Sequence, residues 1–399
     1  MRLDSIKKKN LLYVGANTGF TGTAMAVHSR NIAKIFMECG YDVSYLCQNI
    51  PPVERQFSQE EGYTYIRQYI TIPKFSVLEN ISEEIWGLKM MRLFRKSVKE
   101  SKPDLVISYG STCQMQMIKF CRKHEIPIYA DATDWFEITD RNDSVLNRIF
   151  QFCGDRVIEK ANLMANGVIS ISQFFHQYYL DRGQKSFWLP PVFELPPKTI
   201  FRREPGSPVR LVYAGSLGGN KDTVAPVIQC FLEETAEWMN RFELNLVGIE
   251  EADLNQSFGK HDWKEHRIHA WGRLPHENTL RMVENSDFCI LLRQNKRYAK
   301  AGFSTKFAES MSQGVPMLCT AVGGADMLIQ DMKNGVLVPD NRYETIKEAL
   351  IQISELPNEK LIQMKQNAYD TAEKYFDYHN YTDSIKKFIE ETDCKNDRK

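Results

Sequence analysis

The sequence predicts an α/β protein made of two doubly wound domains that face a cleft. Short apolar runs alternate with helical patterns along most of the 399 residues. A proline-rich stretch interrupts this alternation once, and the alternation then restarts. A chain of this length has room for about two domains of ~150–200 residues each, and strands that alternate with helices form parallel sheets buried on both faces.

The first domain is expected to span residues 1–189. It opens with an apolar run at 11–14, which a glycine-rich turn and a helical pattern at 24–39 follow. Gly40 ends this helix, because glycine readily adopts the left-handed conformation that follows a helix. The same alternation predicts further strands at residues 43–47, 105–109, 126–130 and 168–171.

Residues 190–208 hold six prolines and are predicted to be a linker. The second domain is expected at 209–378, and residues 379–399 are expected to form a helix that returns to the first domain. The strands predicted for the second domain lie at residues 211–214, 244–247, 268–271, 288–292, 316–320 and 336–338.

The amino-acid composition argues against several classes of protein. Lys and Arg number 51 and so do Asp and Glu, which argues against a dedicated nucleic-acid binder. The nine cysteines form no Cys-x-x-Cys pair, and several lie in apolar runs, as core thiols in a reducing compartment do. The start of the chain is polar, and no stretch has the ~18–20 apolar residues of a membrane helix. We therefore expect a cytoplasmic protein, at most peripheral on the inner membrane face.

Three segments have the composition of anion sites. The first, between a strand and a helix, contains Gly15, Gly19, Phe20, Thr21 and Gly22. Its glycines let backbone N–H groups approach a phosphate or a sugar at a helix N-terminus. A dinucleotide fold fits poorly, because the glycine spacing is three then two and no acid ends the second strand. The alternative is a tight turn that binds nothing.

The second segment directly follows the first strand of the second domain. It contains Gly215, Ser216 and Lys221, and its position is expected to face Lys221 toward the cleft. The alternative for this lysine is a solvated surface charge.

The third segment contains the most groups that could bind an anion or a sugar. Ser304 or Thr305 is expected to cap a helix whose first N–H groups would point at an anion. Lys306 lies in the first turn, where a cation opposes the helix dipole unless an anion binds nearby. Glu309 follows about one turn later, and its carboxylate can accept both hydroxyls of a ribose. The alternative is an exposed Lys306–Glu309 pair.

In this order and at these distances, the three segments resemble a GT-B glycosyltransferase, most of all glycosyltransferase family 4. The sequences that carry the resemblance are LVYAGSLGGNKD, AGFSTKFAESMSQGVPML and AVGGADMLIQDMKNGVLVPD. The resemblance implies two Rossmann-like domains around a cleft. It also implies transfer of a hexosyl or N-acetylhexosaminyl group, with retention, from a nucleotide-diphosphate sugar, with UDP as the expected nucleotide. The acceptor would be a glycan or lipid-linked glycan in cell-surface polysaccharide synthesis.

The resemblance also implies roles for individual residues. Glu309 matches the family's second motif glutamate, which holds the ribose, and Lys221 matches the lysine on the diphosphate. Backbone groups at Ser304 and Thr305, next to Gly302 and Phe303, match positions on the phosphate oxygens. The remaining expected donor contacts are the nucleobase segment with Arg273 and Leu274, the loop 15–22, and Gly215 with Ser216.

Three positions depart from the family pattern. Ala301 stands where the first motif glutamate is expected, Ser216 replaces the usual arginine, and Thr133 stands where a histidine is frequent. We expect Arg293 and Lys306 to supply the missing phosphate charge, as in bacterial members whose sequences look like GFPTK. The chain contains no Asp-x-Asp motif, so no metal and no other cofactor is expected. Asp131 or Asp134 is expected either to orient the acceptor hydroxyl or to cap a helix.

Residues 85–102 carry six basic residues against one acid, with Trp86, Met90, Leu93 and Phe94 on one helical face. One hypothesis is that this face meets an anionic membrane that holds a lipid-linked acceptor. The alternative is that the apolar stripe packs on the sheet and the basic side chains are solvated.

Two other functions stay open at this point. Ala301 and Ser216 are compatible with a non-catalytic nucleotide-binding partner of another transferase. A nucleotide-sugar epimerase of the same general fold is the other alternative.

Overall fold

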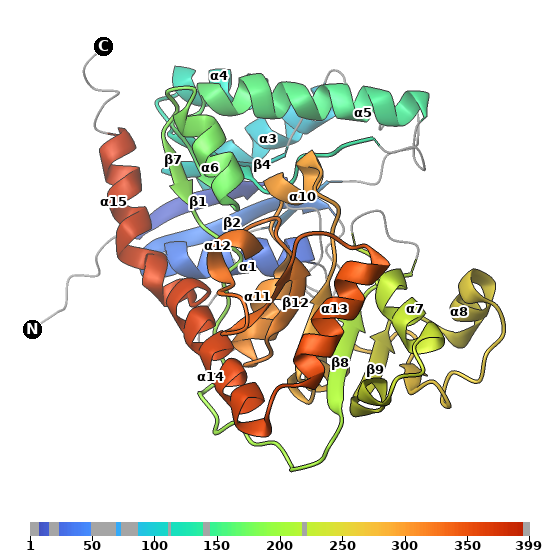
Figure 1. Cartoon of the computed structure of the whole chain (residues 1–399). Helices are drawn as coiled ribbons and strands as arrows, with labels where there is room; N and C mark the ends of the chain where they lie inside the picture. Colours follow the sequence, from blue (N-terminus) through green and yellow to red (C-terminus); the bar gives the residue numbers. More distant parts are fainter. Residues whose placement is uncertain are drawn as a thin grey trace, which may run out of the picture. The chain divides into compact units, whose positions relative to one another are not determined.

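The computed structural model describes residues 8–15, 24–48, 69–72, 87–110, 113–138, 144–217 and 222–393, and it divides into two compact units (Figure 1). The first unit holds the chain up to Glu194 together with the residues from Tyr378 onward. The second unit is Leu195–Asp377. Within the described ranges, no helix combines the length and apolar character needed to cross a membrane. Seven of the cysteines in these ranges are free thiols, five of them buried.

The first unit is built on a seven-stranded parallel sheet with the order β3-β2-β1-β4-β5-β6-β7. The five strands that the sequence predicts are present, each boundary within two residues of its expected place. The chain adds two short strands that the sequence does not reveal. The strands are β1 (Lys9–Val14), β2 (Tyr41–Gln48), β3 (Tyr69–Ile72), β4 (Leu105–Tyr109), β5 (Ile128–Ala132), β6 (Gly167–Ser170) and β7 (Ser186–Trp188).

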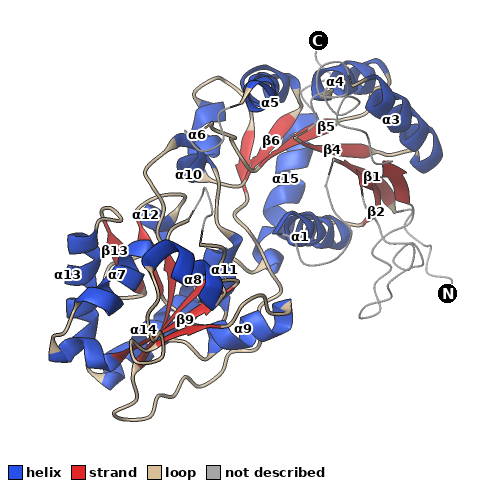
Figure 2. Ribbon diagram, turned by 90° about the vertical axis from the view of Figure 1, so that its right-hand side faces the viewer, coloured by secondary structure: helices blue, strands red, loops and turns tan. Residues whose placement is uncertain are grey.

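Right-handed crossovers distribute the helices of this unit over the two faces of the sheet. The chain runs from β1 toward β3 on one side, and from β4 toward β7 on the other. Consequently α1 (Ala24–Glu38) covers one face, where the C-terminal α15 (Thr382–Asp393) also packs (Figure 2). The opposite face carries α3 (Leu88–Ser101), α4 (Gln114–Lys123), α5 (Val145–Arg156) and α6 (Gln173–Leu180).

The C-terminal helix α15 belongs to the core of the first unit although it lies almost 200 residues beyond the other elements of that unit. Ile385 and Ile389 are buried among the side chains of β1, β2 and β4. The ring of Phe388 takes the space that a Cβ would need at Gly167. The Tyr129 hydroxyl on β5 donates to Asp393 at 2.9 Å. The last helix thus completes the hydrophobic core of the first unit.

The second unit contains a six-stranded parallel sheet with the order β10-β9-β8-β11-β12-β13. All six strands coincide with the predicted ones within two residues, and the predicted doubly wound α/β class is confirmed. The strands are β8 (Val209–Ala214), β9 (Phe242–Val247), β10 (Ile268–Ala270), β11 (Phe288–Leu291), β12 (Met317–Thr320) and β13 (Gly335–Val338). The helices are α7 (Ala225–Glu233), α8 (Glu251–Phe258), α9 (His276–Glu284), α10 (Arg297–Ala301), α11 (Thr305–Ser312), α12 (Ala325–Leu328), α13 (Tyr343–Ser354) and α14 (Asn358–Tyr375).

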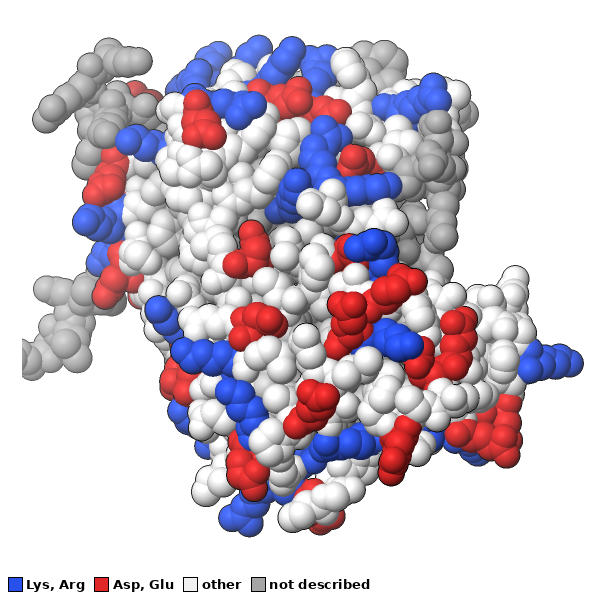
Figure 3. Space-filling model, viewed as in Figure 1, with Lys and Arg blue, Asp and Glu red and all other residues white. Residues whose placement is uncertain are grey.

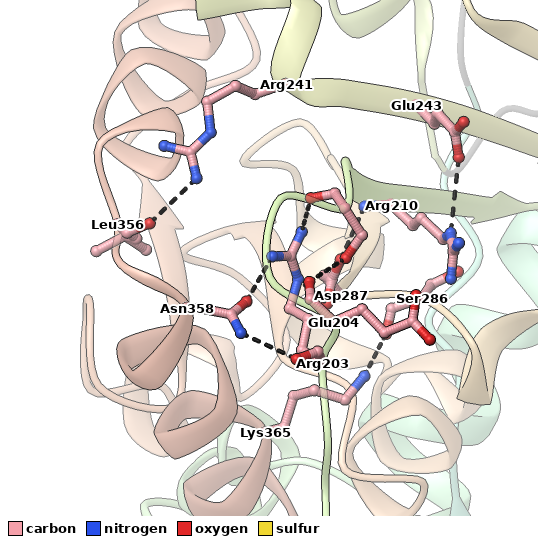
Figure 4. Close-up of polar contacts among 11 residues, drawn as sticks. Arg203, Glu204, Arg210, Arg241, Glu243, Ser286, Asp287, Leu356, Asn358 and Lys365 are labelled. Carbon is pink, nitrogen blue, oxygen red and sulfur yellow. Dashed lines mark hydrogen bonds and ion pairs between the residues drawn. The ribbon is translucent and has the colours of Figure 1, made fainter.

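The proline-rich linker is attached to the second unit through a buried arginine (Figure 4). The Arg203 guanidinium donates to Asp287 at 3.1 Å, to Asn358 at 2.6 Å and to the Ser207 carbonyl at 2.7 Å. Asn358 donates back to the Arg203 carbonyl at 3.0 Å. Beside this group, buried Lys365 on α14 donates to the carbonyl of Ser286. The stretch predicted as a linker is therefore ordered on the second unit from Leu195 onward.

Candidate functional site

A cluster of charged side chains lies at the carboxyl ends of β8 and β11, which are neighbours in the sheet of the second unit. Asp222 is at its centre, and its carboxylate accepts from Arg293 Nε at 2.6 Å and from Lys306 Nζ at 2.7 Å. The Asp222 and Arg293 side chains are largely buried, whereas that of Lys306 is 31% exposed. The lysine is therefore the member of the cluster that solvent or a ligand reaches.

A short backbone bridge explains why residues so distant in sequence meet. Thr223 pairs with Leu292 in an antiparallel bridge, and the Thr223 N–H donates to the Leu292 carbonyl at 2.9 Å. This pairing brings the neighbouring residues Asp222 and Arg293 together. The Arg293 N–H in turn donates to the hydroxyl of Thr320, the last residue of β12, at 2.9 Å.

The cluster keeps an excess of positive charge. Burial by itself would raise the pKa of Asp222, but Arg293 and Lys306 together hold it below its usual value. The carboxylate is thus ionised at neutral pH and compensates one of the two cations. A net charge of about +1 remains in a partly dry environment, where its interaction with an anion is stronger than in bulk water.

Gly215 is explained by the position of the lysine. A Cβ at this residue would lie 2.9 Å from Lys306 Nζ and 2.8 Å from the Tyr213 hydroxyl. The ammonium group also lies 5.3 Å from the centre of the Tyr213 ring. The glycine therefore makes room for the lysine, a role that the sequence does not reveal. Ser216, the next residue, is exposed and accepts from the Tyr213 hydroxyl through its carbonyl at 3.2 Å.

Helix α11 begins beside this cluster without a side-chain cap. Ser304 occupies the N-cap position, as predicted, but its hydroxyl makes no capping hydrogen bond, and Thr305 is the first helical residue. The prediction of a capping bond is thus wrong, while the predicted start of the helix is right. Among the described residues no side chain takes up the N–H groups of Thr305 and Lys306, so these two groups are available to an anion.

The loop before α11 is fixed by aromatic packing. The ring of Phe303 meets those of Phe307 and Phe376 edge to face, with centroids 5.5 and 5.9 Å away. At Gly324, a Cβ would lie 2.4 Å from the Phe303 ring, so only glycine fits there. Gly302 and Ala301 are buried as well. In this loop the Phe303 side chain belongs to the core, so any contact of this residue with a ligand is made by its backbone.

Glu309, one turn into α11, is the second polar group of the site. Its side chain is 22% exposed, and Oε1 lies 3.9 Å from Nε2 of His276 on α9. Burial raises its pKa to about 7, although Lys306 acts in the opposite direction. The carboxyl group is therefore about half protonated at neutral pH when no ligand is present.

His276 is a residue that the sequence did not single out. His276 stands two residues after Leu274 in the sequence. Because it lies close to Glu309, the predicted nucleobase segment is next to the predicted ribose-binding group. Arg273 in that segment is exposed and Leu274 is partly buried. The segment is held by a hydrogen bond from the Gly248 N–H to the Gly272 carbonyl at 2.6 Å.

In the first unit, Asp131 is inside the protein rather than at a surface. Its side chain is 0% exposed, accepts from the Tyr13 hydroxyl, and lies 3.0 Å from His28 Nε2. Burial, followed by the charge of Asp131, raises the pKa of Tyr13 well above its ordinary value. Both Asp131 oxygens have internal partners in this conformation, and its expected contact with an acceptor stays a prediction. Asp134 is exposed, and its role stays a prediction.

Gly15 is the described part of the glycine-rich loop. Its φ is +90°, and a Cβ would lie 2.3 Å from the Tyr109 carbonyl oxygen, so close packing against β4 requires glycine there. The other expected ligand contacts of this loop, Gly19, Phe20, Thr21 and Gly22, lie outside the described residues. So does Lys221.

The packing of α3 shows which of its apolar residues, expected to face either a membrane or the sheet, lie on the sheet. Phe94 and Met91 are buried, and the helix packs on β1, β2 and β3. The sheet-packing alternative is thus correct for Phe94, while Met90 and Leu93 are partly buried and Trp86 lies outside the described residues. Elsewhere, the described residues contain no group of three or more His, Cys, Asp and Glu side chains that could hold a metal ion.

Comparison with known proteins finds one family profile that covers the cluster residues and Glu309. Residues 208–355 match the sequence profile of the family described as Glycosyl transferases group 1. An uncharacterised glycosyltransferase of Methanocaldococcus jannaschii is 25% identical over 184 residues, covering 46% of this chain and 45% of that protein. A Clostridium botulinum UDP-N-acetylglucosamine–N-acetylmuramyl-(pentapeptide) pyrophosphoryl-undecaprenol N-acetylglucosamine transferase is 27% identical over 124 residues, covering 29% of this chain and 33% of that protein. The matches thus span less than half the length of these curated relatives.

Solved structures extend the similarity over both units. Sucrose-phosphate synthase from Thermosynechococcus elongatus has a TM-score of 0.70 at 12% identity, covering 96% of this chain and 99% of that one. Anabaena HepE in complex with UDP has a TM-score of 0.65 at 14% identity, covering 96% and 100% of the two chains. At this identity the likeness establishes the fold.

Proposed function

On the premise that the chain has the GT-B glycosyltransferase fold and a glycosyl transferases group 1 domain, we propose that it is a retaining transferase. Its donor is a nucleotide-diphosphate sugar, with UDP as the nucleotide, and the group moved is a hexose or an N-acetylhexosamine. Its acceptor is a glycan or a lipid-linked glycan of a cell-surface polysaccharide, and the reaction takes place in the cytoplasm.

The observation that carries this proposal is the Asp222–Arg293–Lys306 cluster beside the uncapped start of α11. When the bond between the sugar and the diphosphate breaks, negative charge grows on the departing phosphate. A partly exposed ammonium group held by Asp222, and N–H groups directed out of a helix, stabilise that charge more than the charge of the intact donor. The cluster therefore suits departure of a nucleoside diphosphate.

The nucleoside half of the donor is proposed to bind beside Glu309. An ionised Glu309 can accept both ribose hydroxyls, and His276 places the segment with Arg273 and Leu274 beside it. Two similar proteins support a uridine nucleotide. HepE was solved with UDP, with UDP and glucose, and with UDP-glucose, and the Clostridium enzyme is named for a UDP-N-acetylglucosamine donor.

The proposed reaction proceeds without a metal ion. Arg293 and Lys306 provide fixed positive charge at the diphosphate, and Lys221 is expected to add to it. The acceptor side is proposed to use Asp134, which is exposed at the end of β5. The name of the Clostridium relative, which includes pyrophosphoryl-undecaprenol, supports a lipid-linked acceptor.

A non-catalytic nucleotide-binding subunit is the second candidate, and Ala301 favours it. This residue, the last of α10, is fully buried and offers no carboxylate where the family pattern has one. Such a subunit would bind the donor at the same cluster but would not turn it over.

Thermal unfolding with UDP, GDP, ADP, CMP and NAD, each with and without magnesium, tests the donor site. A ligand at a hundredfold its Kd stabilises by ~2.7 kcal/mol, which corresponds to a rise in Tm of roughly 5–11 °C. We expect UDP alone to produce this shift, equally with and without magnesium. Absence of any shift would contradict the donor site.

Turnover separates the two candidates. Incubation with UDP-glucose or UDP-N-acetylglucosamine should release UDP slowly without an acceptor and faster with one, as a transferase requires. A UDP shift combined with no release under either condition would favour the non-catalytic subunit.

A further inference from the structure

Helix α5 is unusual for a helix of a globular unit, because none of its twelve residues is buried. Val145, Leu146 and Phe152 are 75, 41 and 61% exposed. Apolar side chains on a surface helix normally face the core. Within the part of the chain that the structure describes, this apolar side of α5 is exposed.

A groove runs between α5 and α4, with the π-helical turn Val157–Ala161 closing one side. Its volume is about 490 Å³, and its wall is largely apolar, formed by Met115, Ile149, Phe152 and Val157 among others. Two arginines, Arg148 and Arg156, also line it. The guanidinium of Arg156 lies 5.7 Å from the centre of the Phe152 ring, so charge and apolar surface are interleaved.

The surrounding face is strongly basic in a chain whose net charge is zero. Helices α3, α4 and α5 together carry ten basic residues against two acids, Glu100 and Asp155. All ten are exposed, and Figure 3 shows Lys and Arg side chains along the edge of the protein at the top of the view, where α4 and α5 lie in Figure 1. The ten are Lys89, Arg92, Arg95, Lys96, Lys99, Lys119, Arg122, Lys123, Arg148 and Arg156.

We propose that this α3–α5 face docks on a lipid bilayer with anionic headgroups, with the exposed apolar side chains of α5 inserted between the lipids. An anionic polymer would account for the ten cations but not for the exposed Val145, Leu146 and Phe152. An apolar protein surface would account for those three but not for the charge. The interface of an anionic bilayer offers both negative headgroups and an apolar layer.

The membrane-facing apolar residues lie on α5 and not on the segment 85–102 that the sequence predicts. Phe94 on α3 is part of the core, so this member of the apolar stripe cannot contact a membrane, whereas the cations of α3 are exposed. The apolar contact comes from α5, whose two basic residues lie in the same groove. The inference rests on the proposed function only in that a lipid-linked acceptor would give the docking a purpose.

Co-sedimentation with vesicles tests the surface directly, without any sugar transfer. The purified full-length chain is mixed with vesicles of phosphatidylcholine alone and of phosphatidylcholine with phosphatidylglycerol. We expect binding to the mixed vesicles only, and weaker binding as salt is raised, because exposed charges are screened. The double substitution Leu146→Ser with Phe152→Ser should weaken partitioning by roughly tenfold, and Arg148→Glu with Arg156→Glu by at least as much.

Matched controls separate insertion from simple adsorption. Ile200 is 79% exposed in the second unit, and Ile200→Ser should leave vesicle binding unchanged. Far-ultraviolet circular dichroism and Tm must match the wild type, and the UDP-induced shift in Tm must persist in both α5 variants. Loss of vesicle binding with an intact UDP shift thus distinguishes this surface from the donor site.

Three results would overturn the proposal. Equal binding to neutral and anionic vesicles is one, and unchanged binding of the Leu146→Ser/Phe152→Ser variant is another. The third is a wild-type oligomer that the same variant dissociates, with no binding to either vesicle, because the face would then belong to a second copy of the chain.

Discussion

The burial of the Glu309 carboxyl has a cost to the stability of the free protein once the group is ionised. Its pKa of about 7, raised by burial, lies well above the ordinary 4.5. A carboxyl whose pKa is raised by folding stabilises the fold fully below the unfolded pKa, and this contribution is lost as the pH rises through 7. At pH 8 the buried negative charge therefore destabilises the free protein, and hydrogen bonds from a bound ribose would offset this destabilisation.

Glu309→Gln should remove this destabilisation, because glutamine carries no charge. At pH 8 we expect the free energy of unfolding to rise by about 2 kcal/mol and Tm by roughly 4–8 °C, with little or no gain at pH 4.5. Calorimetry at the two pH values measures this difference. Glu277→Gln, an exposed glutamate on α9 paired with Arg281, is the matched control and should change Tm little at either pH. An equal gain at both pH values would contradict the assignment.

The same carboxyl predicts how donor binding depends on pH. Only the ionised form accepts two hydroxyl donors, so affinity should fall about fivefold between pH 7 and pH 6. UDP-glucose is the ligand to titrate calorimetrically, because its diphosphate has no group that titrates in this range. Glu309→Gln should bind roughly 10–100-fold more weakly at pH 8 and show a flat profile. A wild-type profile that is flat from pH 6 to pH 8 would place the ribose elsewhere.

Asp222 holds two cations together and should be tested by removing only its charge. In Asp222→Asn, Arg293 and Lys306 lose their common counter-ion in a largely buried place. We expect the free protein to lose about 2–3 kcal/mol of stability. The rise in Tm caused by UDP should become larger than in the wild type, because the diphosphate replaces the missing negative charge.

The control for Asp222 is Asp340→Asn. Asp340 is also paired with an arginine, Arg342 at 2.8 Å, but that arginine is exposed. This variant should keep the wild-type response to UDP. A UDP shift in Asp222→Asn that is no larger than that of the wild type would show that the diphosphate does not meet this cluster.

Asp222 also illustrates what sequence reasoning misses at the residue scale. Its partners lie 71 and 84 residues away, and the bridge between Thr223 and Leu292 that brings them together has no local signature. The sequence did indicate Arg293, Lys306 and Glu309, because each stands in or beside a strand–turn–helix segment with its own chemistry. The burial of Asp131 was equally hidden, since it depends on Tyr13 and His28 from two other elements.

At the scale of elements, burial decides which strands can be predicted. Strands β4, β5 and β6 are buried along almost their whole length, and such strands appear in sequence as continuous apolar runs. Strand β7 has three residues, all only partly buried, at the edge of the sheet. Its apolar residues form a short run, 187–189, that leads directly into Pro190 and Pro191, so the sequence there indicates the start of the linker and not a strand. The missing cap at Ser304 is a similar limit, because residue type predicts the cap position and not the bond.

The attachment of the linker to the second unit depends on Arg203 and can be tested by measuring stability. Arg203→Ala should destabilise the second unit by about 3 kcal/mol, since it leaves Asp287 buried without its cation. Urea unfolding measures the change, and the neighbouring, exposed Arg202 provides the control as Arg202→Ala. Arg203→Leu combined with Asp287→Asn should recover part of the loss, because residue 287 then carries no buried charge and its amide oxygen can still accept from the Arg210 N–H. If Arg203→Ala unfolds like the wild type, the linker is not held as Figure 4 shows.

At the scale of the whole molecule, the chain forms two units with separate cores and passes between them twice, after Glu194 and after Asp377. A lesion in the core of one unit should therefore leave ligand binding by the other intact. Ile389→Asp places a charge in the core of the first unit, at a residue of α15 that is 5% exposed, and should cost at least about 3 kcal/mol there.

Hydrogen exchange measured peptide by peptide can locate the damage. Strands β5 and β6 should lose protection in Ile389→Asp, while β8, β11 and β12 keep theirs, and UDP should still protect α11 as in the wild type. Lys387→Asp, on the exposed side of the same helix, should alter neither unit. Because the proposed donor site is built from residues of the second unit only, loss of UDP protection in Ile389→Asp would mean that binding needs a folded first unit as well.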